Sequence, residues 1–466
     1  MSFTSGESRW ADVALATSAR GFATCGQFLT ATTLTLSLQT SGAGGRAVAG
    51  MLLAATLPLV ALAPLTGRLA DRVDSRVLLI GAGLAQSAIC VALAYAGHPL
   101  LVVGLVALLA AGLAVAQPVL AALVPAMVRA TDLPRATALN QTAGMLGVLT
   151  GPALAGFLVG GFGTRVPLLI AAIGYLALVV AGLLVRTRRG GPRQVTVTGG
   201  VAIVDRDAEP AGSWRLRRDP LLVAMVATLA GVIAAIGAIN VIEVFYVRET
   251  LGASASVYGL VTGAWTLGVL CGAWIFARVA GRLTDDGALV QGGLLLLGGC
   301  CVAVLVSVTV PTAALLVPLW LLGGLCNGGD NVFHNLVVAR RVPEAARGRA
   351  FAAVGASVQG AAMVGYLLGG LLLEATEPRP LIVGCGVAGL LVLLGFVVPV
   401  RRAVRAERSR ARQTQAPAGL GRTGPAGAEA PDAESSPAGP PSVGSPGAEP
   451  SGAGSGAGLA TSSASG

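Results

Sequence analysis

The chain has 466 residues, of which 54% are hydrophobic and only 12% charged, and its mean hydropathy is +0.77. Soluble domains carry about 25% charged residues, so a chain this long and this poor in charge cannot cover a water-facing surface. The net charge of +10 comes from arginines clustered between apolar runs, which points to membrane topology and away from a nucleic-acid partner.

The apolar runs predict membrane-spanning helices, because roughly 20 helical residues cross a hydrocarbon core about 30 Å thick. These runs do not alternate apolar and polar residues, as the strands of a closed barrel would. We therefore predict an all-α integral membrane protein with twelve transmembrane helices, at residues 13–38, 47–66, 77–97, 100–127, 138–161, 166–185, 221–246, 256–277, 288–308, 312–335, 350–373 and 380–399.

A polar, arginine-rich stretch separates six spans from six, and the two halves echo each other. Gly67-Arg68-Leu69 follows the second span, and Gly281-Arg282-Leu283 follows the eighth. Such repeats predict two pseudo-symmetric six-helix bundles with the substrate path between them. The predicted units are an N-terminal bundle (1–185), a central loop (186–219), a C-terminal bundle (220–400) and a disordered tail (401–466) rich in Ala, Gly, Pro and Ser.

Arginine placement predicts the orientation. With both termini inside, the inner connections hold nineteen arginines and the outer ones four, as the positive-inside rule requires. The N-terminus lacks a small-residue cleavage pattern, so we expect it to remain as the first helix. The expected location is a bacterial inner membrane, with the central loop and the tail in the cytoplasm.

The connection after the second span reads Gly67-Arg68-Leu69-Ala70-Asp71-Arg72-Val73-Asp74-Ser75-Arg76. Glycine lets two helices meet at a tight turn, and Asp71 can accept hydrogen bonds from a helix N-terminus, where partial positive charge favours a carboxylate. We interpret Gly67, Asp71, Arg72 and Arg76 as a conformational latch against the start of the eleventh span. The alternative is that these charges only set the topology.

The fifth predicted span carries Gly147, Gly151, Pro152 and Gly156. Small residues allow close backbone approach, and Pro152 removes one hydrogen bond and bends the helix. The simpler interpretation is that these residues serve packing only, since the chain has 66 glycines.

Both motifs resemble signatures of the major facilitator superfamily, and the resemblance covers residues 10–400. The first is similar to G-x-x-x-D-[RK]-x-G-[RK]-[RK], except that Asp74 and Ser75 replace a glycine and a base. The second is similar to the antiporter signature G-x-x-x-G-P-x-x-G-G, with Ala155 replacing one glycine. The stretch from Ala138 to Gly163 resembles the bacterial drug- and siderophore-exporting branches.

The resemblance implies the major facilitator fold and export of a drug- or metabolite-like small molecule by alternating access, with protons moving in antiport. Many proton-coupled antiporters carry an arginine in the fourth span, where this chain has Gln117 as its main polar group. An importer or facilitator of the same fold, and a non-transporting membrane sensor, are the alternatives.

Ionisable groups inside a bilayer are costly and are therefore candidates for function. Arg20 in the first span either extends to the interface or faces a cavity and binds an anionic group. Glu243 either lines the external mouth or pairs with Arg248. Further candidates for a substrate or proton site are amides: Gln27, Asn140, Gln141 and Gln359.

The tenth predicted span contains Asp330 and His334, which an i, i+4 spacing places on one helix face, as it does Asn327 and Asn331. A carboxylate beside a histidine can take and release a proton. The alternative is a structural polar patch in which Asp330 pairs with an arginine of an inner loop.

Other function classes find no support in the sequence. The chain contains no lysine, so a P-loop of the G-x-x-x-x-G-K-[ST] type cannot form. With His98 and His334 as its only histidines, it offers neither a metal-ligand cluster nor a Ser/His/Asp set. We therefore expect a non-enzyme without cofactors that uses the proton gradient, with a small-molecule substrate and the lipid bilayer as partners, no nucleic acid, and a monomeric state.

Overall fold

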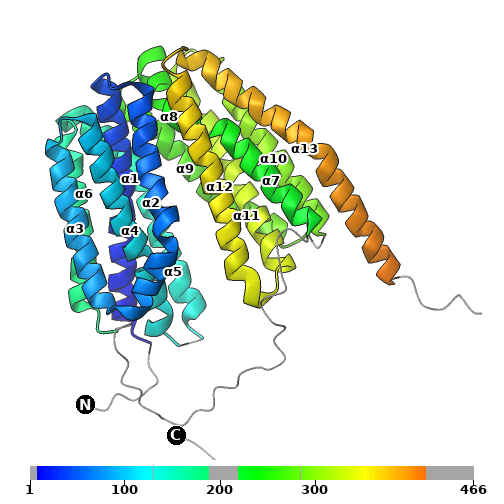
Figure 1. The fold of residues 1–466 in the computed structure, drawn as a ribbon, viewed down its shortest axis with the longest axis horizontal. Helices are drawn as coiled ribbons and strands as arrows, with labels where there is room; N and C mark the ends of the chain where they lie inside the picture. The colour runs from blue at the N-terminus through cyan, green and yellow to red at the C-terminus, as the bar shows by residue number, and fades with distance from the viewer. Residues whose placement is uncertain (1–7, 130, 188–218, 284, 416–466) are drawn as a thin grey trace, which may run out of the picture. The chain divides into compact units, whose positions relative to one another are not determined.

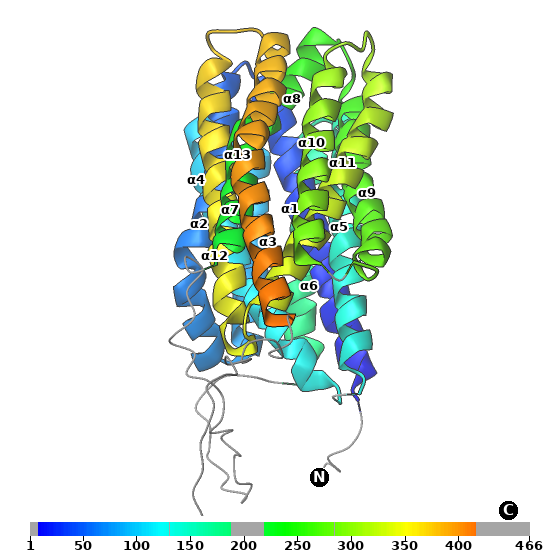
Figure 2. The same ribbon diagram turned by 90° about the vertical axis from the view of Figure 1, so that its right-hand side faces the viewer.

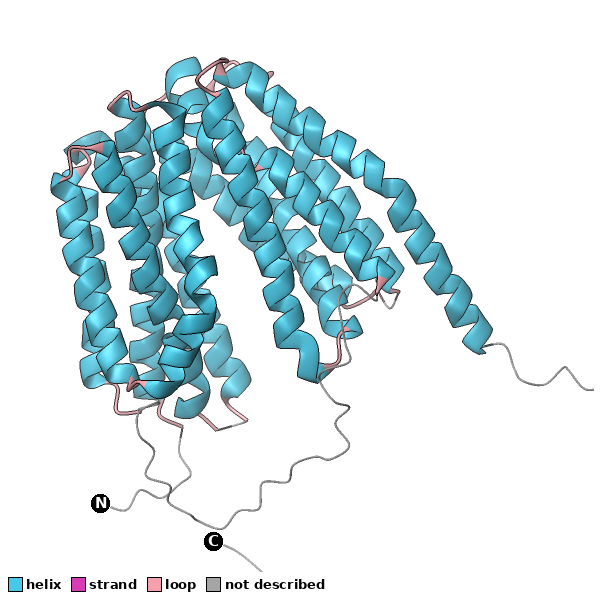
Figure 3. Ribbon diagram, viewed as in Figure 1, coloured by secondary structure: helices cyan, strands magenta, loops and turns pink. Residues whose placement is uncertain are grey.

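The computed structural model describes residues 8–129, 131–187, 219–283 and 285–415, and the regular structure within these ranges is helical, with no strand (Figure 3). This confirms the predicted all-α class. The helices are α1 (Trp10–Thr40), α2 (Gly44–Arg72), α3 (Ser75–Tyr95), α4 (Pro99–Met127), α5 (Leu133–Phe162), α6 (Arg165–Leu184), α7 (Pro220–Ile236), α8 (Ile239–Phe245), α9 (Ala255–Ala280), α10 (Asp286–Ser307), α11 (Leu316–Arg341), α12 (Glu344–Leu372) and α13 (Pro378–Gln415).

Every predicted span falls on one of these helices, and the seventh is built from α7, α8 and a π-helical turn, Tyr246–Thr250. Eleven helical segments in the described ranges are long and apolar enough to cross a membrane. The remaining predicted span is α1, which is 31 residues long and rich in threonine. Because α1 packs against α2, α4, α5, α6 and α8, other helices shield much of it from lipid and it needs less hydropathy.

Aspartates and prolines fix where several helices begin. Asp74, Asp219 and Asp285 each accept hydrogen bonds from backbone N–H groups in the first turns of α3, α7 and α10. Pro99 and Pro220 occupy the first positions of α4 and α7, where the missing N–H would have no partner within the helix. These caps confine the polar backbone ends to the connections between spans.

The outward faces of the helices are apolar. Large aliphatic side chains on five of them are more than 60% exposed: Val77, Leu100, Ile173, Leu295, Leu391 and Leu394. Exposed apolar residues at this density do not suit water, whereas they match the hydrocarbon interior of a bilayer.

Figure 1 shows α1–α6 gathered on one side and α7–α13 on the other, and we call these groups the N-half and the C-half. In the N-half, α1 packs on α5 and α2 packs on α4. The C-half repeats this pairing, since α7 packs on α12 and α9 packs on α11. The halves contact each other mainly through α5 with α9 and α2 with α12.

We name the two ends of the bundle by their residues. The basic end is where α1 begins and where α6 and α11 finish, and it carries the arginine-rich connections. The distal end is where α1 finishes and where α2 and α9 begin.

The last helix differs from the prediction. α13 continues without a break to Gln415, so residues 401–415 are helical, although the sequence assigned them to the disordered tail (Figure 2). Arg401, Arg402 and Arg405 end the apolar span, but arginine is a good helix former and the backbone continues. The rest of the predicted tail, 416–466, and most of the central loop, 188–218, lie outside the described residues.

Candidate functional site

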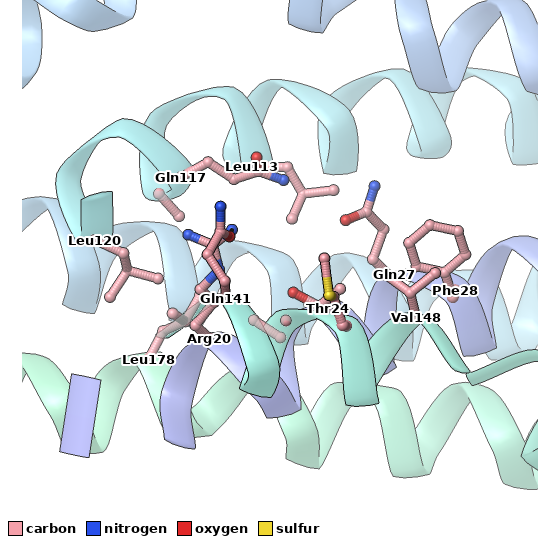
Figure 4. Close-up of a pocket in the computed structure, with 14 residues that line it drawn as sticks. Arg20, Thr24, Gln27, Phe28, Leu113, Gln117, Leu120, Gln141, Val148 and Leu178 are labelled. Atoms are coloured by element: carbon pink, nitrogen blue, oxygen red, sulfur yellow. Dashed lines mark hydrogen bonds between the residues drawn. The ribbon is translucent and has the colours of Figure 1, made fainter. Parts of the chain in front are cut away.

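A cavity of about 340 Å³ lies within the N-half, between α1, α4, α5 and α6. Its polar lining consists of Arg20, Thr24, Gln27, Gln117 and Gln141. Figure 4 shows Arg20, Gln117 and Gln141 toward one end of the cavity and Gln27 and Phe28 toward the other. Three of the sequence candidates, Arg20, Gln27 and Gln141, therefore lie together.

Arg20 is the charged residue of this N-half cavity. Its side chain crosses from α1 toward α5, where Nη2 donates a hydrogen bond to Oε1 of Gln141 at 3.1 Å. A glycine on α5 makes room for it, because a Cβ at Gly144 would lie 3.0 Å from Nε of Arg20. The half-buried guanidinium thus contacts an amide of α5 in the cavity wall.

A second cavity, of about 270 Å³, lies within the C-half between α7, α8, α9, α11 and α12. Glu243 is its charged residue and is only 9% exposed. Oε1 of Glu243 accepts hydrogen bonds from Nε1 of Trp320 at 3.1 Å and from the Thr262 hydroxyl at 3.3 Å. Arg248 instead donates to the backbone oxygen of Ala253, at 2.7 Å. The structure therefore places Glu243 in a cavity wall.

Asp330 and His334 form a buried pair on one face of α11. Nδ1 of His334 lies 2.8 Å from Oδ1 of Asp330, and the two side chains are 9% and 1% exposed, respectively. Gly293 of α10 packs directly over both. The pair lines neither cavity.

The remaining amide candidates are dispersed. Asn327 lines the C-half cavity and accepts hydrogen bonds from the amide of Asn331, which is exposed. Asn140 is buried, and its Oδ1 has no hydrogen-bond partner among the described residues. Gln359 on α12 is half-buried and lines neither cavity.

The glycine motif of α5 joins three helices. A Cβ at Gly147 would lie 2.6 Å from the backbone oxygen of Gly21 on α1, and one at Gly151 would lie 3.0 Å from that of Cys25. Farther toward the distal end, a Cβ at Gly156 would lie 2.8 Å from Cα of Gly259 on α9. One face of α5 therefore packs on α1 within the N-half, and a different face, beyond Pro152, contacts α9 of the C-half.

Two polar pairs accompany this contact at the distal end. Arg46 of α2 forms an ion pair with Glu374, just after α12, at 2.7 Å. Gln39 of α1 donates to Glu249 at 2.9 Å. We call these pairs and the α5–α9 contact the distal closure, since all of them join the two halves.

The predicted latch lies at the other end of α2. The backbone places Gly67, Asp71 and Arg72 in the last two turns of α2, and their side chains lie outside the described part of the structure. Arg76 lies in the first turn of α3, where its backbone N–H donates to Asp74 at 2.8 Å. The latch remains a prediction.

The sequence did not show which side chains pair with one another in each cavity, although it marked Trp320 as a possible cavity residue. Gln117 was noted only as the polar residue of its span, and Thr24 was not singled out. The partners of Glu243, Thr262 and Trp320, come from two different helices. The available signal was a lone polar side chain within an apolar run, and it does not specify which helix faces meet.

Comparison with known proteins agrees with this architecture. The family model described as the Major Facilitator Superfamily matches residues 16–245 and 221–438. No curated protein matches the chain.

Among solved structures, the chain is similar to a bacterial homologue of the human lysosomal transporter Spinster, with 13% identity and a TM-score of 0.64, covering 87% of this chain and 98% of that one. It is also similar to the nucleoside transporter NupG, with 13% identity and a TM-score of 0.65, covering 83% and 99%. A peptide transporter, POT, has 15% identity and a TM-score of 0.64, covering 87% and 96%. The chain belongs to the major facilitator superfamily.

Proposed function

We propose that this chain is a secondary active transporter that exports a small molecule from the cytoplasm in exchange for protons. The observation that carries the proposal is the position of the N-half cavity relative to the distal closure. Gln141 precedes Gly156 by 15 residues on α5, a separation of roughly 22 Å along the helix. A polar cavity inside one half, with the two halves joined beyond it, fits one state of an alternating-access cycle.

The proposed direction of transport rests on two features. The arginine-rich connections lie at the basic end, so the positive-inside rule assigns that end to the cytoplasm. The glycine motif of α5, which resembles the antiporter signature, forms part of the distal closure. Substrate thus enters the cavity from the cytoplasm and leaves when the closure opens.

Glu243 is the group that we propose to carry the proton. It lies in a cavity wall, whereas Asp330 and His334 pack from α11 against α10 and line neither cavity. Both described hydrogen bonds to Glu243 come from neutral donors, so no cation holds its charge permanently. Among the described residues, the other titratable groups around it are the tyrosines Tyr258 of α9 and Tyr366 of α12.

Everted membrane vesicles from cells that overproduce the chain test this function. When the vesicle interior is made acidic, a substrate from a panel of antibiotics and metabolites should accumulate inside the vesicles. Protons leave in exchange, so the uptake should dissipate the pH gradient. Glu243→Gln should abolish the coupling to pH while substrate still binds. Glu377→Gln, which alters an exposed carboxylate at the distal end, is the matched control and should behave as the parent chain.

Each other outcome has a defined meaning. Uptake into right-side-out vesicles alone would identify an importer. Accumulation that survives Glu243→Gln with unchanged dependence on pH would remove Glu243 from the coupling step. Failure of every compound to move in either vesicle type would favour a non-transporting sensor.

A further inference from the structure

We infer that the N-half cavity selects small molecules bearing an oxyanion group, a carboxylate or a phosphate, and that this group binds Arg20. The inference rests on the proposed transport function and names its substrate class.

The guanidinium of Arg20 has N–H groups that its described hydrogen bond does not use. Arginine offers five N–H groups, and the one described hydrogen bond of Arg20 uses a single donor, toward Gln141. Among the residues that the structure describes, no aspartate or glutamate lines the cavity. A cation inside a membrane protein is costly without a partner, so a site of this kind favours an anion that pairs with it.

The nearby acidic side chains have other partners. Asp12, two turns before Arg20 on α1, accepts hydrogen bonds from the backbone and the hydroxyl of Thr187, at 3.0 and 2.8 Å. Asp132, at the start of α5, accepts a hydrogen bond from Ser8. Among the described residues, Arg20 forms no ion pair, which leaves its positive charge for a ligand.

The remaining polar lining suits a ligand rich in oxygen atoms. Gln27 and Gln117 each present an amide N–H₂ group, and Thr24 adds a hydroxyl. Apolar side chains, including Phe28, Leu113 and Val148, complete the wall. A group with several acceptor oxygens can therefore bind the polar end while an apolar body contacts the other.

The glycine beside the guanidinium is a second, independent feature. A Cβ at Gly144 would lie 3.0 Å from Nε of Arg20, tighter than ordinary van der Waals contact. Glycine at this position therefore lets the guanidinium lie against the α5 backbone. The arginine is held at the cavity wall by the shape of α5 as well as by Gln141.

The C-half cavity carries the opposite charge to the N-half cavity, which increases the difference in how the two halves bind an anion. Glu243 is the charged residue of the C-half cavity, so an anion finds attraction in one half and repulsion in the other whenever Glu243 is ionised. The structure thus separates an anion-binding role for the N-half from a proton-carrying role for the C-half.

Equilibrium binding to the purified full-length chain tests the inference without a pH gradient. The probes share one ring and differ in charge: benzoate and phenyl phosphate as anions, benzamide as the neutral match, and benzylamine as the cation. Melting temperature against probe concentration gives each dissociation constant. We expect an anion to bind at least tenfold more tightly than benzamide, and benzylamine not to bind.

Variants assign the effect to Arg20. Arg20→Gln should weaken anion binding at least tenfold, and Arg20→Lys should restore part of it. Arg165→Gln, which removes an arginine stacked on Tyr95 at the distal end, is the matched control and should bind as the parent does. Gly144→Ala keeps the positive charge but displaces the guanidinium, so it should also weaken anion binding. This variant replaces Arg20→Gln in the test if Arg20→Gln does not fold.

Three results would overturn the inference. Neither anion binds, the anions bind no more tightly than benzamide, or anion binding is unchanged in both Arg20→Gln and Gly144→Ala. Because no transport is measured, such a result leaves the vesicle experiment and the role of Glu243 unaffected. Loss of coupling in the vesicles with normal anion binding would instead count against the proposed proton antiport alone.

Discussion

The substitution Gly156→Ala addresses the distal closure most sharply. The added Cβ would lie 2.5 Å from the backbone oxygen of Ala255 and 2.8 Å from Cα of Gly259. Ordinary contact begins near 3.4 Å, so α5 and α9 must separate by roughly 0.9 Å, and both obstacles are backbone atoms that cannot rotate away. Overpacking of this kind costs about 1–3 kcal/mol.

That cost falls on the closed state, because the contact is made only where the two halves meet. A penalty of about 1–3 kcal/mol lowers the ratio of closed to open molecules roughly 5- to 150-fold. We therefore expect Gly156→Ala to populate the state that is open at the distal end. Gly161→Ala on the same helix is the control, since a Cβ there meets nothing within 4 Å.

Cross-linking reports the closure directly. Cysteines replacing Arg46 and Glu374, whose long side chains meet in an ion pair at 2.7 Å, should be joined efficiently by a bifunctional thiol reagent in the parent and in Gly161→Ala. Gly156→Ala should reduce the rate of cross-linking at least fivefold, with the chain lacking both new cysteines as background. An unchanged rate in correctly folded Gly156→Ala would refute the closure as described.

Three further predictions follow from single contacts. Asp330→Asn should lower the melting temperature, with a loss of about 1–3 kcal/mol from the buried pair with His334, and leave pH-driven transport intact; a changed pH profile would return Asp330 to the coupling scheme. Gly328→Ala should destabilise the C-half strongly in thermal unfolding, because its Cβ would lie 2.1 Å from a backbone oxygen of α9, whereas Gly355→Ala meets open space and should be neutral. Arg46→Gln should change closure by no more than about fivefold, since an exposed ion pair is worth about 0–1 kcal/mol, and a larger effect on distance measurements between the halves would contradict this.

The spans could be predicted because the physics of a membrane helix is local. An apolar run of sufficient length becomes a helix wherever the chain places it, and the repeated halves follow from the central break. α1 was found by the same reasoning, although α1 alone lies below the hydropathy of the other spans. The end of α13 was missed because leaving the bilayer does not end a helix.

The site was only partly predictable. A charged or amide side chain in an apolar run marks a candidate, and this identified Arg20, Gln141 and Glu243. The sequence could not show that Gln141 bonds Arg20 or that Trp320 bonds Glu243, because those contacts depend on how each helix is rotated against its neighbours. The i, i+4 spacing of Asp330 and His334 gave their shared face correctly but not the glycine of α10 that covers it.

The central claim, that a substrate cavity opens to the basic end while the distal end is closed, is tested by labelling one position from both sides of the membrane. A cysteine replacing Gln117, an exposed residue of the N-half cavity, is treated with a membrane-impermeant thiol reagent. We predict faster labelling in everted vesicles, which present the basic end, than in right-side-out vesicles. Faster labelling from the distal side, in a chain whose distal closure is intact by the cross-linking assay, would contradict the account.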